Sequence, residues 1–476
     1  MISRRLGSIL LALVLVTGMV TAYFWGTPRL VQFSPLANAG AVPAKTPLRL
    51  VFSRPMQAAS VTERLTIYPP QTGAFDWEGQ TLVFTPDQPW PSGATIEVHL
   101  APGARAAGLL PLQLVDETSW SFIVRQPRLV YLFPADQLSN IYALDINTGE
   151  SQQLTDSSNG IAEFDMDTDG TRIYYSAKNA TGGSDIFRLM VPQGDEDVDA
   201  TQEREASPEI IVECPKALCR APQISPDGDF LAYERSALAG SGEPAFPQVW
   251  LLSLPGEEVT NPVSAVASDP DRQTMQPDWS PEGLLTFYDS TLSAFIILDP
   301  HTGESTRFPN QTGQAGSWNP NGRDYVAPEI SFVELVGSPQ LGEPGTIANS
   351  HLIRFNRENG KTQDLTLAHN LEDTAPVFSP DGRYLALARK FLDNTRWTPG
   401  RQLWLMRSDG SEAHPLTNDP YFNHYDFAWS PDGDQLAYVR FNQTTLTEPP
   451  EIWLIDTLST RATRLVVGGY APQWIP

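Results

Sequence analysis

Three aspartates at alternate positions have a spacing that suits metal ligands. They are Asp165, Asp167 and Asp169, and Gly170 follows them. Carboxylates at alternate positions before a glycine form the first half of an EF-hand calcium loop. The second half is absent, because the twelfth position is Ser176 where the loop needs glutamate. We therefore interpret the segment as a structural turn, with calcium binding by the three aspartates as the alternative.

The sequence contains two cysteines, Cys214 and Cys219. In an exported protein, two cysteines this close are expected to form a disulfide that closes the short loop between them. Two free thiols are the alternative. A metal site is disfavoured, because the six histidines are scattered and supply no further ligands.

Signatures of enzyme active sites are missing from the sequence. It has no Gly-x-Ser-x-Gly elbow, no His-Glu-x-x-His motif and no phosphate-binding P-loop. We therefore predict no catalytic, cofactor-binding or metal-binding residues, and no enzymatic activity. An active site assembled from scattered loops leaves no local motif, so an enzyme is kept as the alternative function.

The charge balance is acidic. The chain has 32 lysines and arginines against 56 aspartates and glutamates, a net charge of −24. Binding to nucleic acid phosphates needs a basic surface, so this composition argues against a nucleic acid partner.

A repeated hairpin is the element that must position any site in this chain. In one copy, Pro376–Phe378 is a short apolar strand, Ser379–Gly382 is a turn and Tyr384–Leu387 is a second strand. Proline presets the first turn position, aspartate bonds its own backbone and glycine accepts a positive φ. Other copies of the hairpin begin at Phe164, Pro222, Pro277, Gly316 and Phe427.

Each hairpin is followed by two further strands in most copies. The third strand reads Gln248–Leu252, Gln402–Met406 or Glu451–Asp456, and the fourth often ends in Leu-Thr. Four short strands per repeat predict a β-propeller. The Ser-Pro-Asp-Gly turn resembles that of the TolB-like propellers, over about residues 128–476. Recurring tryptophans, such as Trp279 and Trp429, are interpreted as core residues between blades.

The two ends of the repeat region complement each other. The strands from Arg128 to Leu154 form a blade that lacks its first strand. The segment Tyr470–Pro476 copies the first strand of the other repeats and then stops. Pairing these two segments would hide the free sheet edges. We predict a seven-bladed propeller closed by its C-terminal strand, with six or eight blades as alternatives.

A different all-β unit precedes the propeller. Short strands separated by proline-rich turns in residues 29–126 have the rhythm of an Ig-like sandwich. The segments that carry a resemblance to the SbsA-type bacterial Ig-like domain are Phe33–Pro35, Val42–Pro43, Phe52–Met56, Phe84–Pro86 and Trp120–Phe122. That resemblance implies a spacer or surface module of an exported protein.

The N-terminal segment is apolar. Arg4 and Arg5 precede an uncharged run from Leu6 to Trp25, and about 20 helical residues span a bilayer core. The arginines predict a cytoplasmic N-terminus and an extracytoplasmic remainder. We expect residues 1–28 to be a single-pass transmembrane anchor. A signal peptide cleaved after Ala22 is the alternative, which would make the protein secreted or periplasmic.

These features predict an all-β protein with three parts: an anchor (1–28), an Ig-like domain (29–126) and a propeller (127–476). We predict a membrane-anchored, extracytoplasmic binding or scaffold protein. The resemblance to the TolB-like propellers implies a protein or peptide partner at one mouth of the propeller. The alternative is a propeller lyase or hydrolase that acts on extracellular or cell-wall polysaccharide.

Overall fold

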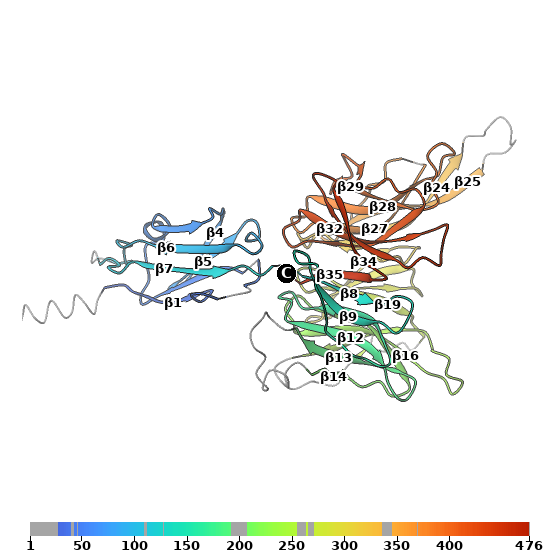
Figure 1. Ribbon diagram of the computed structural model, residues 1–476, viewed down its shortest axis with the longest axis horizontal. Coiled ribbons are helices and arrows are strands. Elements are labelled where there is room, and N and C mark those ends of the chain that lie inside the picture. Colours follow the sequence, from blue (N-terminus) through green and yellow to red (C-terminus); the bar gives the residue numbers. More distant parts are fainter. Residues whose placement is uncertain are drawn as a thin grey trace, which may run out of the picture. The chain divides into compact units, whose positions relative to one another are not determined.

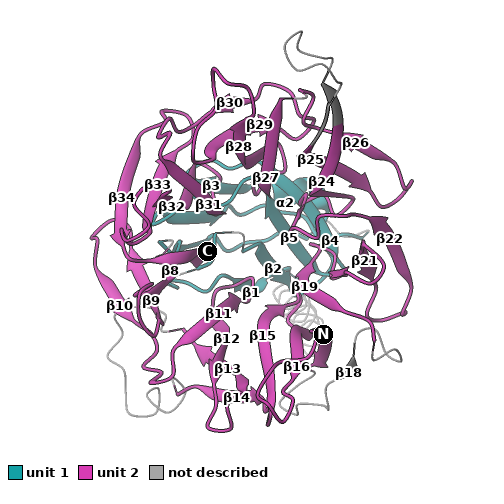
Figure 2. Ribbon diagram, turned by 90° about the vertical axis from the view of Figure 1, so that its right-hand side faces the viewer, with its two compact units in different colours: residues 1–126 teal, residues 127–476 magenta. Residues whose placement is uncertain are grey.

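The computed structural model describes residues 27–39, 42–44, 46–108, 112–126, 128–191, 207–254, 263–264, 271–335, 345–368 and 370–475. The chain forms two compact units, Met1–Gln126 and Pro127–Pro476, which Figure 2 shows in different colours. Each unit has its own hydrophobic core.

Unit 1 consists of two β-sheets and one short helix. One sheet has the order β1-β2-β5-β4 and contains β1 (Leu30–Ser34), β2 (Leu48–Phe52), β5 (Thr81–Pro86) and β4 (Gly73–Glu78). The other has the order β3-β6-β7 and contains β3 (Leu65–Tyr68), β6 (Thr95–Leu100) and β7 (Thr118–Ile123). The helix α2 (Ala58–Thr62) lies between β2 and β3 in the chain.

The core of unit 1 lies around Trp90, which is fully buried. Its indole Nε1 donates a hydrogen bond of 2.8 Å to the carbonyl oxygen of Thr46, so its polar atom is satisfied. Phe84 and Phe122 pack against its ring. The alternation of buried and exposed residues along β6 is that of a strand with one face in a core. Unit 1 is therefore the Ig-like sandwich that its strand rhythm predicts.

Unit 2 is built from groups of four antiparallel strands. One group joins the two ends of the unit in the order β10-β9-β8-β35. Its strands are β10 (Ser151–Gln153), β9 (Asn140–Asp145), β8 (Arg128–Phe133) and β35 (Tyr470–Ile475).

The next two groups share one continuous eight-stranded sheet, because β13 pairs in parallel with the start of β15. The first group contains β11 (Ile161–Met166), β12 (Arg172–Lys178), β13 (Ser184–Met190) and β14 (Glu209–Val212). The second contains β15 (Ala217–Ile224), β16 (Phe230–Ala237), β17 (Gln248–Ser253) and β18 (Val263–Ser264).

The remaining groups are separate four-stranded sheets. The first contains β19 (Thr274–Trp279), β20 (Leu285–Asp289), β21 (Ala294–Leu298) and β22 (Ser305–Pro309). The second contains β23 (Ser317–Trp318), β24 (Asp324–Leu335), β25 (Gly345–Asn356) and β26 (Thr362–Asp364). The third contains β27 (Leu371–Phe378), β28 (Tyr384–Phe391), β29 (Gln402–Arg407) and β30 (His414–Pro415). The last contains β31 (Phe422–Trp429), β32 (Gln435–Asn442), β33 (Glu451–Asp456) and β34 (Ala462–Val467).

The groups follow one another around a common centre. Figure 2 shows the first strand of each group nearest that centre and the fourth strand at the outside. The second strands are buried along most of their length, and β20 is buried throughout. Such strands need cover on both faces, which the groups before and after them supply. Unit 2 is therefore a β-propeller, and its first strands line a central channel.

The Ser-Pro-Asp-Gly turns have the local chemistry that the sequence predicts. The hydroxyl of Ser379 donates a hydrogen bond of 2.6 Å to Asp381 and accepts one of 3.0 Å from the backbone N–H of Tyr384. Gly382 has a φ of +70°, which a side chain would strain. The motif thus fixes the link between the first and second strands of its group.

The C-terminal strand completes the group that begins at Arg128. Strand β35 pairs antiparallel with β8, with Trp474 opposite Leu129 and Tyr470 opposite Leu132. This is the pairing that the sequence repeat predicts.

One group differs from the others. Strands β24 and β25 are each 12 residues long, and their hairpin extends beyond its neighbours (Figure 1). Because this group is the least regular in sequence, its long hairpin was not predicted.

In the described part of the chain, no helix is long and apolar enough to cross a bilayer. The predicted anchor, residues 6–25, lies outside the described residues.

Candidate functional site

Five of the channel-lining strands, β15, β19, β27, β31 and β35, have a bulge at the same place in the repeat. The bulged residues have φ values between +46° and +56°, and they are Ala221, Gln276, Ala375, Asp426 and Ala471. At each of them, the pairing with the second strand shifts register. Such bulges redirect the side chains that follow them.

The residue two positions after the bulge is equivalent in every group and lies on a channel-lining strand. The set of equivalent residues is Asp165, Gln223, Asp278, Ser317, Val377, Ala428 and Gln473. Polar members come from β35, β11, β15, β19 and β23. Apolar members come from β27 and β31. At the height of these equivalent residues, which we call the channel level, the channel is therefore polar on one side and apolar on the other.

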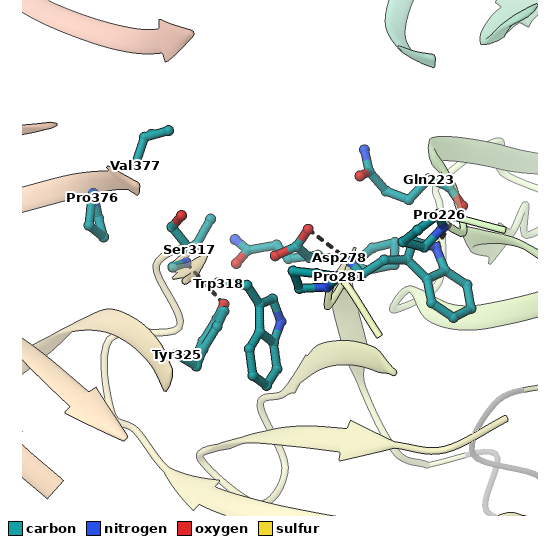
Figure 3. Close-up of a pocket in the computed structure, with 14 residues that line it drawn as sticks. Gln223, Pro226, Asp278, Pro281, Ser317, Trp318, Tyr325, Pro376 and Val377 are labelled. Carbon is teal, nitrogen blue, oxygen red and sulfur yellow. Dashed lines mark hydrogen bonds between the residues drawn. The ribbon is translucent and has the colours of Figure 1, made fainter. Parts of the chain in front are cut away.

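A pocket of about 500 Å³ opens on the polar side of this level. Gln223, Asp278 and Ser317 contribute its polar groups (Figure 3). The rings of Trp279, Trp318 and Tyr325, together with prolines of the Ser-Pro turns, contribute its apolar surface. The described residues that line the pocket include one carboxylate and no lysine, arginine or histidine.

The carboxylate of Asp278 accepts one hydrogen bond, of 2.9 Å, from the backbone N–H of Trp279 to Oδ1. Burial raises the pKa of Asp278 to about 7. The carboxylate of Asp165, on β11, accepts a hydrogen bond of 2.9 Å from the backbone N–H of Ile224. Burial, and to a smaller extent repulsion from Asp278, raises the pKa of Asp165 to about 7.

Tyrosine and serine hydroxyls at the pocket wall are engaged with the backbone. Tyr325 accepts a hydrogen bond of 3.1 Å from the N–H of Gly316, and its pKa is raised by burial and by the charge of Asp278. Ser317 accepts one of 3.2 Å from the N–H of Phe378. These bonds fix the wall of the pocket between β23 and β27.

Tryptophans of the channel-lining strands link each group to the one before it. The indole Nε1 of Trp279 donates to the carbonyl of Gln223 at 3.0 Å, and that of Trp429 donates to Val377 at 3.1 Å. Both acceptors occupy the channel level described above. These tryptophans are predicted to be core residues. Their indole N–H groups also hold the backbone of the preceding channel-lining strand in place.

Of the three aspartates singled out as calcium ligands, Asp167 and Asp169 share the hydrogen-bond donor Thr171. Asp167 accepts hydrogen bonds from the backbone N–H groups of Thr171 and Arg172, at 2.8 and 2.9 Å. Asp169 accepts one of 2.6 Å from the Thr171 hydroxyl. Asp165 bonds to the next group instead. Within the described ranges, no group of three or more His, Cys, Asp or Glu side chains could hold a metal ion. The calcium interpretation remains an untested prediction.

Cys214 and Cys219 form a disulfide with a Cα–Cα distance of 6.2 Å. Both are buried. The backbone N–H of Cys214 donates to the carboxylate of Asp185 at 2.8 Å. The bond therefore fixes the connection between β14 and β15.

Large apolar side chains are exposed on one end of the propeller. Loops that join second to third strands, or one group to the next, all lie at the end where the channel-lining strands begin. The exposed residues in these loops, or toward the tip of the long hairpin, are Leu138, Phe246, Leu292, Phe332, Leu367, Trp397, Tyr421 and Leu446. We call this set the apolar loop face. At the opposite end, the loop between β33 and β34 exposes Leu458.

A second, smaller pocket of about 210 Å³ lies at the same end as the apolar loop face. It is lined by Lys178, Arg220, Ser139 and Tyr470, among others. Lys178 and Arg220 are exposed. This pocket therefore places two basic side chains at one end of a propeller whose chain is acidic as a whole.

Sequence inspection alone did not identify the pocket residues. Asp165 stands out in the sequence through its spacing from Asp167 and Asp169. Gln223, Asp278 and Ser317 stand out only as parts of the repeated hairpin. A signal was present, because the residue just before a large apolar residue near the end of each first strand occupies the channel level.

The fold places the protein in the class of β-propellers that carry an N-terminal Ig-like domain. Residues 26–124 match the family model of the bacterial Ig-like domain. This segment is thus a bacterial Ig-like domain, as its sequence motifs predict.

Known proteins similar to the chain include one of uncharacterized function from Agrobacterium fabrum, 23% identical over 49% of this chain and 70% of that protein. Among solved structures, TolB from Acinetobacter baumannii has a TM-score of 0.41 and 12% identity, covering 94% of this chain and 99% of TolB. A puromycin-hydrolyzing peptidase from Mycobacterium tuberculosis has a TM-score of 0.49 and 12% identity, covering 90% of this chain and 57% of the peptidase. The similar structures thus include both TolB and an enzyme.

Proposed function

We propose that this protein is a membrane-anchored, extracytoplasmic binding protein whose propeller holds a partner protein at its apolar loop face. In this proposal, residues 6–25 anchor the chain and the Ig-like domain is a spacer. The propeller is a closed ring of seven blades, in which the eight-stranded sheet counts as two blades. Binding requires no catalysis.

The observation that carries the proposal is the exposure of large apolar side chains at one end of the propeller. Phe246, Trp397 and Leu446 have 70%, 55% and 75% of their surface exposed. They come from three different blades. Contiguous exposed apolar patches mark protein-binding sites on soluble proteins, and in this proposal the loops bring these side chains into one such patch. Aromatic residues such as Trp397 are also enriched among the residues that dominate binding energy.

The charge at the same end adds specificity to this surface. Lys178 and Arg220 flank the smaller pocket. A partner that presents an acidic side chain beside an apolar patch would satisfy both features. Complementary charges of this kind mainly raise the association rate and select the partner.

An enzyme that acts on polysaccharide remains the second candidate. It would need catalytic side chains from several blades to converge in the channel. Asp165 and Asp278, from different blades, interact there electrostatically, and each has a pKa raised to about 7. One raised carboxylate could donate a proton and another accept one. The described residues of the large pocket include no histidine or arginine to assist them.

The test is quantitative co-purification from native membranes with matched variants. Trp397→Ser and Leu446→Ser change the apolar loop face, whereas Leu458→Ser changes the opposite end. We expect one partner protein to be recovered with the wild type and with Leu458→Ser, and to be depleted with the other two variants. Equal recovery with all variants would contradict the proposal.

A further inference from the structure

The large pocket lies at the end of the propeller away from the apolar loop face. Its walls include Pro226 and Pro281, which belong to the turns that end channel-lining strands. The apolar loop face lies where these strands begin. A ligand in this pocket would therefore bind at a different place from the partner at the apolar loop face.

Two acceptor groups of the pocket, the carboxylate of Asp278 and the side-chain oxygen of Gln276, are incompletely satisfied within the described chain. The indole N–H of Trp279 is used by the Gln223 carbonyl, and that of Trp318 by the Thr286 hydroxyl, at 3.0 Å each. Asp278 accepts a single hydrogen bond among the described residues. The Oε1 atom of Gln276, whose side chain lines the pocket, is buried and has no partner among them. Buried acceptors without donors are unfavourable, so the site favours a ligand that donates hydrogen bonds.

The negative charge of the pocket also favours a ligand that donates hydrogen bonds, and in particular a cation. In the described part of the protein, neither Asp165 nor Asp278 forms an ion pair with a basic side chain. A cation placed beside Asp278 would relieve the repulsion between these two carboxylates.

The surroundings favour an organic cation. A divalent metal needs several oxygen ligands at short distance, and the described residues of the pocket supply one carboxylate. The walls include apolar atoms of proline, valine and largely buried aromatic residues, against which an alkyl chain packs well.

We propose that this pocket binds a protonated primary amine, with the ammonium group donating to Asp278 and its carbon chain lying against the apolar part of the wall. The amine is either a free alkylamine or a lysine side chain of a peptide that enters the channel. The inference does not depend on the partner proposed for the apolar loop face.

The pH dependence of amine binding follows from the groups that face Asp278. These are Asp165 on β11 and Tyr325 on β24, since the described lining has no basic residue. The pKa of each carboxylate is raised to about 7. Affinity should therefore increase as the pH rises through this range and the carboxylates become ionised.

The experiment is calorimetric titration of the whole protein with three probes at pH 8. These are cadaverine, the peptide acetyl-Gly-Lys-Gly-amide and the same peptide with an acetylated lysine side chain. We expect at least one free-amine probe to bind, the acetylated peptide to fail, and Asp278→Asn to weaken binding by about tenfold or more. Asp426→Asn is the matched control, because Asp426 is also a channel-strand carboxylate whose pKa is raised by burial, but it does not line the pocket.

The two free-amine probes also separate the sources of the ligand. Binding of cadaverine alone assigns the site to free amines, and binding of the lysine peptide assigns it to a peptide. The proposal is overturned if neither binds at concentrations of about 10 mM, where even affinities near 4 kcal/mol are detected. It is also overturned if Asp278→Asn and Asp426→Asn lose binding equally. Thermal unfolding of each variant verifies that it is folded.

Discussion

The indole Nε1 of Trp474 donates a hydrogen bond of 2.9 Å to the carbonyl oxygen of Ala428. Trp474 belongs to the C-terminal strand β35, and Ala428 belongs to β31 of the preceding blade. The same bond, from Trp429 to Val377, links the preceding pair of blades. The C-terminal strand is thus held on both sides, by this bond and by its pairing with β8.

Removal of Tyr470–Pro476 should unfold the propeller and leave the Ig-like domain folded. The deletion exposes the edge of β8 and removes a buried tryptophan, a loss that by itself costs about 3–5 kcal/mol. Calorimetry should show the transition of the Ig-like domain without that of the propeller. Trp474→Phe, which keeps an aromatic side chain but loses the indole N–H and part of the buried volume, should lower the free energy of unfolding by at least about 1–2 kcal/mol. An unchanged melting temperature of the deletion variant would show that β35 does not close the ring.

Asp278→Asn should stabilise the protein more at pH 8 than at pH 5. The pKa of Asp278 is raised to about 7 in the folded state from an ordinary value of 3.8. The folded state therefore binds the proton more tightly, and the wild type loses stability as the pH rises from about 4 to about 7. Asparagine removes this loss, by about 1–3 kcal/mol at pH 8. Denaturant unfolding at both pH values measures the difference, and greater stabilisation at pH 5 would contradict the assigned pKa.

Replacement of Cys214 and Cys219 by serine should lower the free energy of unfolding only slightly. The cysteines are five positions apart, and a disulfide that closes so short a loop removes little freedom from the unfolded chain, worth about 2 kcal/mol or less. Thiol labelling of the exported protein without reductant should modify neither cysteine. Labelling of both would show that the disulfide does not form in the cell.

The apolar N-terminal segment should remain attached to the mature protein. Residues 6–25 are uncharged, and the sites for a signal peptidase within them are weak. Membrane fractionation should place the protein in the membrane pellet, and sequencing of its N-terminus should give residues before Leu6. A soluble product that begins at Tyr23 would mean that the segment is a signal peptide.

Local patterns sufficed to predict the strands, the turns and the partner of the last strand. The Ser379–Gly382 turn is one example, because its hydrogen bonds join residues a few positions apart. The pairing of β35 with β8 could be predicted despite the distance in sequence, because one end of the chain lacks the strand that the other end supplies.

The pocket could not be predicted in the same way. Asp165 and Asp278 interact because the ring brings β11 and β19 to a common channel, and no local pattern encodes that relation. The bulges at Gln276 and Ala375 decide which side chains face the channel, yet glutamine and alanine have no preference for a positive φ that a sequence would reveal. The apolar loop face is likewise invisible in sequence, because Leu446 and Trp397 share it only through the order of the blades.

Site-specific photo-crosslinking tests most directly whether the apolar loop face holds a partner. A photoreactive phenylalanine analogue would replace Trp397, Leu446 or Phe246 in separate variants, and Leu458 in the control, with irradiation of intact cells. We predict that the three loop variants crosslink to the same protein and that the variant at position 458, where the native leucine is 88% exposed, gives no such product. Crosslinking from position 458 alone, or from all four positions equally, would contradict the account.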